Sequence, residues 1–152
     1  MIQSGDPDSK HAKAGVELGN GGPSYTISAE FRPFLFHHKG VIAAAREGDD
    51  VNPKKASAGS QFYIVEGKKF TDAGLDSVER FRLHGRKIPA DQRSVYKTIG
   101  GTPHLDQNYT VFGEVIGGLN VVDSIALVPT DKNDRPLQDV RIIRMRLIKR
   151  KD

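Results

Sequence analysis

The 152-residue chain contains no cysteine. Disulfides, thiol nucleophiles and thiolate metal sites are therefore excluded, and the usual clue to the redox compartment is missing. No apolar run reaches the ~18 residues that a membrane-spanning helix needs. No basic segment followed by an apolar stretch opens the chain, so no secretory signal is visible. These absences exclude several classes of protein and leave the cellular location open.

Charged residues are plentiful but evenly spread. The chain has 23 Lys and Arg residues against 19 Asp and Glu residues, a formal net charge of +4. The one tight basic run, residues 149–151, is typical of a solvated tail. A nucleic-acid-binding surface gathers its Lys and Arg on one face, which this distribution does not indicate. The length and the ordinary composition predict one globular domain over residues 1–152.

Most of the chain has the pattern of a β protein. Short runs of β-branched and aromatic residues alternate with turn residues, as is typical of strands. They predict strands at residues 2–3, 25–28, 40–46, 61–65, 110–116 and 140–148. A short amphipathic helix is predicted at 119–126. Many short strands with few helices favour an antiparallel sheet rolled into a barrel.

Residues 66–103 have a different, helical character. Residues 72–83 carry Leu75, Val78 and Phe81, whose three-residue spacing gives one helix a narrow apolar stripe. Pro89 suits the first position of a second helix, which a pair of glycines ends. Lys and Arg on the other faces are typical of solvated helices. This segment is predicted to be a helical insertion on the surface of the β domain.

Two kinds of catalytic site are not supported by the sequence. His37 and His38 are adjacent, so on a strand they point to opposite faces, and the other three histidines lack ligand-like spacings. Neither a metal site nor a cofactor is therefore predicted. Ser60 lacks the second glycine of the Gly-x-Ser-x-Gly turn that exposes a nucleophilic serine, so acyl transfer is not indicated.

Residues 57–65 are the most informative stretch. A flexible Ser/Ala/Gly turn runs into a strand with Gln61 at the junction and two aromatic residues directly after it. A primary amide can bind a peptide backbone through its oxygen and its NH2 group together, while aromatic rings supply an apolar floor. The stretch therefore predicts a site that grips an extended peptide.

The same stretch carries a resemblance to a known family. The central signature of the cyclophilins, the peptidyl-prolyl cis/trans isomerases, resembles Ala58-Gly59-Ser60-Gln61-Phe62-Tyr63-Ile64. Three further segments fit in the family's order: residues 1–7, residues 40–46, and Leu105-Asp106 leading into residues 111–115. The resemblance extends to about residue 148 apart from the helical insertion, which is similar to that of bacterial members of the Bacteroides group.

The resemblance implies an eight-stranded antiparallel β-barrel with a helix capping each end and a peptide groove on its outer wall. Met1, Tyr63 and Leu105 would line a pocket for the substrate proline, Gln3 and Gln61 would hydrogen-bond the substrate backbone, Ala45 and Arg46 would run alongside the residue before proline, and Tyr109 would close the rim. Gln61 is the catalytic candidate within the chain. Many relatives have Asn, Trp and His where this chain has Arg46, His104 and Tyr109.

The implied ligands are proline-containing peptides, unfolded proteins and cyclosporin-like compounds. Family members also use an arginine in a Phe-His-Arg stretch, which would lie before Met1, together with the first strands and helix of the barrel. One hypothesis is that the chain is a fragment, or has a misassigned start, of an ordinary isomerase. The alternatives are a shortened homologue that binds proline-containing peptides with little turnover, and a structural β domain without a site.

Overall fold

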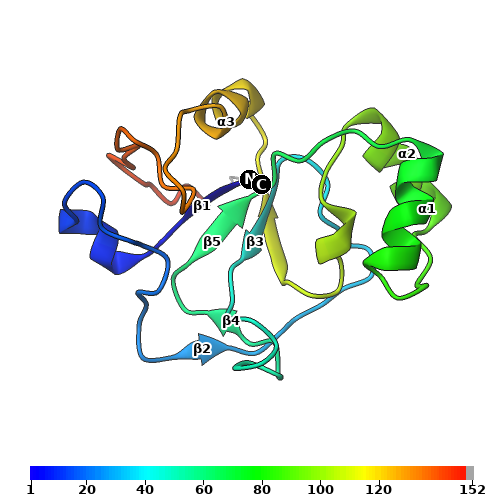
Figure 1. The fold of residues 1–152 in the computed structure, drawn as a ribbon, viewed down its shortest axis with the longest axis horizontal. Coiled ribbons are helices and arrows are strands. Elements are labelled where there is room, and N and C mark those ends of the chain that lie inside the picture. Colours follow the sequence, from blue (N-terminus) through cyan, green and yellow to red (C-terminus); the bar gives the residue numbers. More distant parts are fainter. Residues whose placement is uncertain (150–152) are drawn as a thin grey trace.

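The computed structural model describes residues 1–149 and contains two sheets, three α-helices and two short 3-10 helices (Figure 1). The strands are β1 (Ile2–Ser4), β2 (Thr26–Ile27), β3 (Val41–Ala44), β4 (Ser57–Ala58), β5 (Phe62–Ile64) and β6 (Val111–Glu114). The helices are η1 (Pro7–His11), α1 (Asp72–Phe81), α2 (Ala90–Thr98), η2 (Pro103–Leu105) and α3 (Leu119–Ala126). Most of the basic run at 149–151 lies outside the described residues.

All the strand pairs are antiparallel. The larger sheet has the order β1-β5-β3-β6, and β2 pairs with β4 in a second, two-stranded sheet. Five of the six predicted strand regions form strands, and the helices are minority elements. The prediction of a mainly β, antiparallel architecture is confirmed.

One face of the larger sheet carries the main core. Successive residues of a strand point to opposite faces, so Val41 and Ala43 lie on the same side as Tyr63 and Val65 of the neighbouring strand. These residues, with Ala45 and Val111, form one buried apolar cluster. Leu105, the last residue of η2, and Tyr109, in the loop between η2 and β6, pack against the same cluster.

The helical insertion has an apolar core of its own. Helix α1 begins after Thr71, whose hydroxyl accepts a hydrogen bond from the Gly74 backbone N–H at 3.1 Å. The buried residues Leu75, Leu83, Ile88 and Tyr96 pack together between α1, the loop after it and α2. Figure 1 shows both helices together beside η2, with α3 near β1 on the other side of the sheet. The predicted helices of residues 66–103 and 119–126 are confirmed.

The strand predicted at residues 140–148 is wrong. This segment forms no strand, and its apolar side chains are exposed, with Ile143 at 97% and Leu147 at 106% relative exposure. Alternating side chains specify a strand only where a neighbouring strand supplies the hydrogen bonds. Within the described part of the chain, this segment pairs with neither edge of the four-stranded sheet.

Glu79 is a buried carboxylate that ties α1 to the rest of the insertion. Its oxygens accept from Lys87 Nζ at 2.7 Å, from the Ile88 backbone N–H at 3.0 Å and from Arg93 Nη1 at 2.8 Å. The contact with Lys87 is the largest influence, and together the three donors outweigh burial and lower the pKa of Glu79 to about 2.

The depressed pKa of Glu79 predicts a loss of stability in acid. Because the folded-state pKa is below the ordinary value of 4.5, the stabilisation is present above that value and lost as the pH falls towards about 2. Glu79→Gln should therefore lower the free energy of unfolding by about 1–3 kcal/mol at neutral pH, since Lys87 is largely exposed and screened. Urea titrations between pH 7 and pH 2 should show the two proteins converging.

Asp76→Asn is the matched control for Glu79→Gln. Asp76 also contacts Arg93, at 3.0 Å, but its side chain is 65% exposed. An exposed ion pair contributes about 0–1 kcal/mol, so this variant should unfold almost as the parent does. A constant difference between Glu79→Gln and the parent across the whole pH range would contradict the assignment.

Candidate functional site

Two of the predicted site residues, Gln3 and Tyr63, lie at facing positions of the larger sheet. Gln3 of β1 lies opposite Tyr63 of β5, and Tyr63 lies opposite Ala43 of β3. Gln61 is two residues before Tyr63, so its side chain points to the same face. The spacing Gln61-x-Tyr63 thus places the amide and the aromatic ring on the same face of the sheet.

The Gln61 side chain grips a segment of its own chain. Its Nε2 donates to the Gly19 carbonyl oxygen at 2.9 Å and to the Gly21 carbonyl oxygen at 2.6 Å. Its Oε1 accepts from Nε2 of Gln3 at 3.0 Å. The NH2 end of the amide therefore binds backbone carbonyl groups of the loop around residues 19–21, while its oxygen accepts from the side chain of Gln3.

Asp6 holds the same loop from the other side. Its carboxylate accepts from the backbone N–H groups of Gly19 at 2.6 Å, Gly21 at 3.2 Å and Asp8 at 2.8 Å. Burial opposes ionisation, but these three donors hold the pKa of Asp6 below its usual range. A Cβ atom on Gly21 would lie 2.1 Å from Asp6 Oδ1, so any larger residue there would displace the Asp6 carboxylate from the loop. Asp6 and Gln61 together fix the loop 19–21 against the site.

Removal of the Asp6 carboxylate should release this loop. Asp6→Ala leaves the Gly19 and Gly21 amides without their charged acceptor, which should cost about 1–3 kcal/mol of local stability. Hydrogen exchange followed by NMR should show faster exchange at both amides. Asp8→Ala removes a neighbouring exposed carboxylate as the control. Equal exchange rates in the two variants would contradict the role of Asp6.

Tyr63, Leu105 and Tyr109 form an apolar corner beside the amides. The Tyr63 and Tyr109 rings meet edge to face with centroids 5.8 Å apart, and Leu105 packs on the same core. Burial, with Tyr109 and Asp106 nearby, raises the pKa of Tyr63 far above its usual value, so its hydroxyl keeps its proton. Three of the four residues predicted to line or close a proline pocket are thus neighbours, with Tyr63 itself only 2% exposed.

A buried hydrogen-bond network supports this corner from behind. Asp106 Oδ1 accepts from the His37 backbone N–H at 2.8 Å and lies 3.0 Å from His37 Nδ1, while its Oδ2 accepts from the Tyr96 hydroxyl at 2.7 Å. A carboxylate only accepts, so the His37 proton is on Nδ1 and Nε2 is free to accept from the Tyr63 hydroxyl, 3.0 Å away. The network joins the helical insertion to Tyr63.

Arg46 covers the outer side of Tyr109. Its guanidinium carbon lies 4.6 Å from the centre of the Tyr109 ring, within the range of a cation–π contact. Its Nε donates to the Asn108 carbonyl oxygen at 2.8 Å, and its Nη1 lies 2.7 Å from Asp49 Oδ1. The side chain is only 5% exposed. A planar guanidinium can make all these contacts at once, whereas a shorter Asn could not.

Met1 and Ala45 occupy less constrained positions. Met1 is half exposed at the start of the chain, before β1. Ala45 is buried, its N–H donates to the Gln61 carbonyl oxygen at 3.0 Å, and its own carbonyl oxygen accepts from Ala58 at 2.8 Å. The backbone of Ala45 is thus paired within the fold, and its methyl group belongs to the buried apolar cluster.

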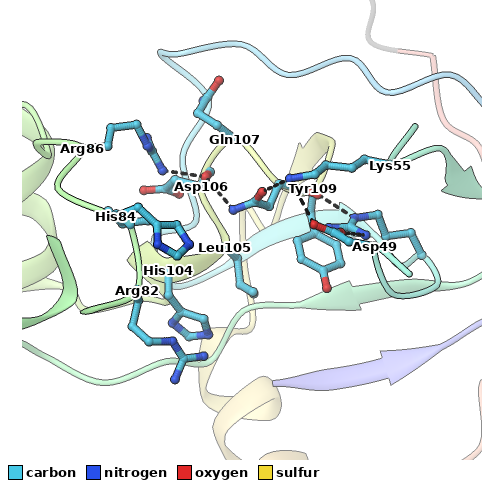
Figure 2. Close-up of a pocket in the computed structure, with 13 residues that line it drawn as sticks. Asp49, Lys55, Arg82, His84, Arg86, His104, Leu105, Asp106, Gln107 and Tyr109 are labelled. Atoms are coloured by element: carbon cyan, nitrogen blue, oxygen red, sulfur yellow. Dashed lines mark hydrogen bonds and ion pairs between the residues drawn. The ribbon is translucent and has the colours of Figure 1, made fainter. Parts of the chain in front are cut away.

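A cavity of about 430 Å³ adjoins this corner (Figure 2). Arg46, Leu105 and Tyr109 line it, as predicted site residues, together with residues that sequence reasoning missed. Five of the ten other lining residues are basic or histidine: Lys55, Arg82, His84, Arg86 and His104. The alternation of basic residues with Phe81 and Leu83, at the end of α1 and just after it, was the available signal. In the sequence this alternation is also typical of a solvated helix face.

Two further properties of the described residues bear on the class of site. Within residues 1–149, no three His, Asp or Glu side chains come together in an arrangement that could hold a metal ion. Across the same part of the chain, every helix is too short or too polar to cross a membrane.

Comparisons with known proteins agree with the geometry. The family model of the cyclophilin type peptidyl-prolyl cis-trans isomerase/CLD matches residues 1–147. A protein of Staphylococcus aureus USA300 named as a peptidyl-prolyl cis-trans isomerase is 34% identical over 145 residues, which cover 93% of this chain and 64% of that protein. A Streptococcus pyogenes protein named as a bifunctional phosphatase/peptidyl-prolyl cis-trans isomerase is 34% identical over 147 residues, covering 93% of this chain and 27% of that protein.

The chain belongs to the cyclophilin-type peptidyl-prolyl cis-trans isomerase family. The crystal structure of a cyclophilin-type isomerase from Cryptosporidium parvum shares the fold, with a TM-score of 0.55 and 23% sequence identity over 90% of this chain and 60% of that one. The predicted cyclophilin-like fold and family are thereby confirmed. The chain spans less than two thirds of the length of these relatives.

Proposed function

We propose that this protein catalyses cis/trans isomerisation of Xaa-Pro bonds in peptides and proteins without a covalent intermediate. The observation that carries the proposal is the meeting of two kinds of group on one face. The apolar corner of Tyr63, Leu105 and Tyr109 lies beside the linked amides of Gln3 and Gln61. An apolar pocket with a few convergent polar groups is the usual form of a ligand site.

The physical chemistry of the peptide bond defines what such a site must do. Rotation meets a barrier of ~18–20 kcal/mol because amide resonance is lost in the twisted state. An Xaa-Pro bond populates both isomers and exchanges slowly, over tens to hundreds of seconds. A site accelerates this exchange by binding the twisted amide more tightly than either planar form.

Each group of site residues has a separate role in binding the substrate. Tyr63, Leu105 and Tyr109 hold the proline ring, with Met1 at the open edge of the pocket. Gln3 and Gln61 hydrogen-bond the substrate backbone, and Gln61 is the catalytic candidate. Ala45 and Arg46 lie alongside the residue before proline. Fixing the flanking chain while the ring stays in its pocket leaves the Xaa-Pro bond as the part that turns.

The ligands of this groove are proline-containing segments of peptides and unfolded proteins. Family membership supports this class of ligand. Cyclosporin-like compounds, which family resemblance also implies, should compete with peptides for the same groove. No resident cofactor takes part, because rotation about a single bond transfers neither electrons nor atoms.

The test is isomerisation of an Xaa-Pro test peptide. We expect the protein to shorten the relaxation well below the uncatalysed tens to hundreds of seconds. Leu105→Ala should lower kcat/KM by about tenfold, because removing methyl groups from an apolar pocket costs about 1–3 kcal/mol of transition-state binding. Relaxation at the uncatalysed rate with parent protein would overturn the proposal.

Leu127→Ala is the matched control for Leu105→Ala. Leu127 directly follows α3 and is 83% exposed, so the same truncation there removes no packed surface. It should leave kcat/KM unchanged. Thermal unfolding of both variants shows whether any loss of activity at Leu105 comes from the fold rather than from the pocket.

A further inference from the structure

The cavity beside the proline corner is built jointly by the β domain and the helical insertion. Leu105 and Tyr109 line both the apolar corner and this cavity. The opposite wall comes from the segment just after α1, with Arg82, His84 and Arg86. Figure 2 shows Leu105 between these basic residues and Tyr109. A peptide whose proline contacts Leu105 must therefore pass the cavity with a neighbouring residue.

The charges around the cavity are unbalanced. Four basic side chains line it, from Arg46, Lys55, Arg82 and Arg86, against two carboxylates. Asp49 lies 2.7 Å from Arg46 and 3.5 Å from Lys55, so it serves those two cations. Neither Arg82 nor Arg86 of the insertion lies within ion-pair distance of Asp49.

The second carboxylate, that of Asp106, is directed away from the cavity. Both of its oxygens accept hydrogen bonds from buried groups, on His37 and Tyr96. Arg86 reaches only the Asp106 backbone carbonyl oxygen, at 2.7 Å. Within residues 1–149, Arg82 has neither a hydrogen-bond nor an ion-pair partner for its guanidinium, which lies next to His104 in Figure 2.

The backbone around the cavity is also unusual. Lys55, His84 and Gln107 adopt positive φ values of 54°, 52° and 61°. They are three of the four non-glycine residues with positive φ among those described, and all three line this cavity. Such conformations cost free energy and are concentrated at ligand sites, where surrounding contacts hold side chains in a required direction.

We infer that this cavity is a subsite for an acidic side chain of the bound peptide, adjacent to the proline. The inference rests on the proposed function, since it places the proline in the Tyr63, Leu105 and Tyr109 corner. The Asp or Glu carboxylate lies near Arg82 and Arg86, and the helical insertion thereby sets a preference among substrates. A peptide with a basic residue at that position is disfavoured by the same charges.

The experiment measures the affinity of labelled proline-containing peptides by fluorescence anisotropy. Matched sets carry Glu, Gln or Lys at each position flanking the proline. At one position, the parent protein should bind the Glu peptide about three- to tenfold more tightly than the Gln peptide and the Lys peptide more weakly, as partly exposed charges do. Raising the salt concentration should reduce the differences.

Charge reversal identifies the residue responsible. Arg82→Glu should invert the order so that the Lys peptide binds more tightly than the Glu peptide. Arg80→Glu is the matched control, because Arg80 is an exposed residue of α1 outside the cavity wall. It should keep the parent preference. Equal affinities for Glu, Gln and Lys peptides at every position, or equal effects of the two variants, would overturn the subsite.

A parallel readout separates the subsite from the proposed function. Isomerisation of the Gln peptide is followed with the same protein samples. Acceleration without discrimination among the peptides overturns the subsite and leaves the isomerase intact. Discrimination that Arg82→Glu reverses, without any acceleration, supports the subsite and overturns the isomerase.

Discussion

Replacement of Asp106 by alanine is expected to lower the free energy of unfolding by about 3–5 kcal/mol, because it leaves several buried donors without an acceptor at about 1–3 kcal/mol each. Asp106 is only 3% exposed and accepts from the backbone and ring of His37 and from Tyr96. Its loss leaves these buried donors unsatisfied. Domains are stable by only about 5–15 kcal/mol, so the variant should lose a large part of its stability. Urea unfolding checks the prediction.

Two further variants define what is lost at Asp106. Tyr96→Phe removes one hydrogen bond of the network and should cost about 1–2 kcal/mol. Asp139→Ala removes a carboxylate that pairs with Arg135 and Arg141 on the surface, and should cost less than about 1 kcal/mol. If Asp106→Ala unfolds at the same urea concentration as Asp139→Ala, the network does not stabilise the fold.

The network also gives Asp106 an effect on the site. His37 lies between Asp106 and Tyr63, so Asp106→Ala frees the imidazole that positions the Tyr63 hydroxyl. The connection through Tyr96 means that the helical insertion and the proline corner share one buried carboxylate. An insertion that sequence reasoning treated as surface decoration is therefore part of the support of the site.

Local patterns in the sequence predict most of the secondary structure. The apolar alternation of residues 61–65 and the stripe with Leu75 and Val78 predict a strand and a helix because each depends on neighbours in the chain. The segment at 140–148 has an equally clear alternation but forms no strand. Strand formation depends on a partner elsewhere in the chain, and no pattern within the segment reports whether that partner is in reach.

The candidate site likewise combines residues that local patterns predict with contacts that they do not predict. Gln61 and Tyr63 could be predicted because an amide followed at the next alternate position by an aromatic residue is a local signal. The contacts that complete the site are long-range: His37 is separated from Asp106 by 69 residues, and Gln61 from Gly21 by 40. Physical reasoning on one sequence cannot pair such residues. The family resemblance supplied the groove residues, but not the basic cavity, which depends on where the insertion packs.

Gln61→Glu is expected to lower kcat/KM for Xaa-Pro isomerisation by about 10- to 100-fold, equivalent to the loss of one or two hydrogen bonds to the peptide backbone. The substitution keeps the size of the side chain but removes its donors. A carboxylate can still accept from Gln3, yet it cannot donate to the Gly19 and Gly21 carbonyl oxygens. It also places a negative charge near Asp6, which holds the same loop.

Gln138→Glu adds the same charge at an exposed position and should leave kcat/KM unchanged. An unchanged kcat/KM in Gln61→Glu would remove Gln61 from the site. A large loss still has two explanations, however, because the amide serves both the loop 19–21 and, in the proposed function, the substrate. Activity of Gln61→Glu alone does not separate them.

Asp6→Ala separates the two explanations for a loss of activity in Gln61→Glu. It releases the loop by removing the acceptor of the Gly19 and Gly21 amides, and it leaves the Gln61 amide in place. If the loop shapes the groove and Gln61 acts only through it, the two variants should lose the same factor in kcat/KM. If Gln61 also binds the substrate backbone, Gln61→Glu should lose about tenfold more than Asp6→Ala, the effect of one further hydrogen bond. We expect the second result, because an amide that already binds the backbone of its own loop has the geometry to bind a peptide that takes the loop's place.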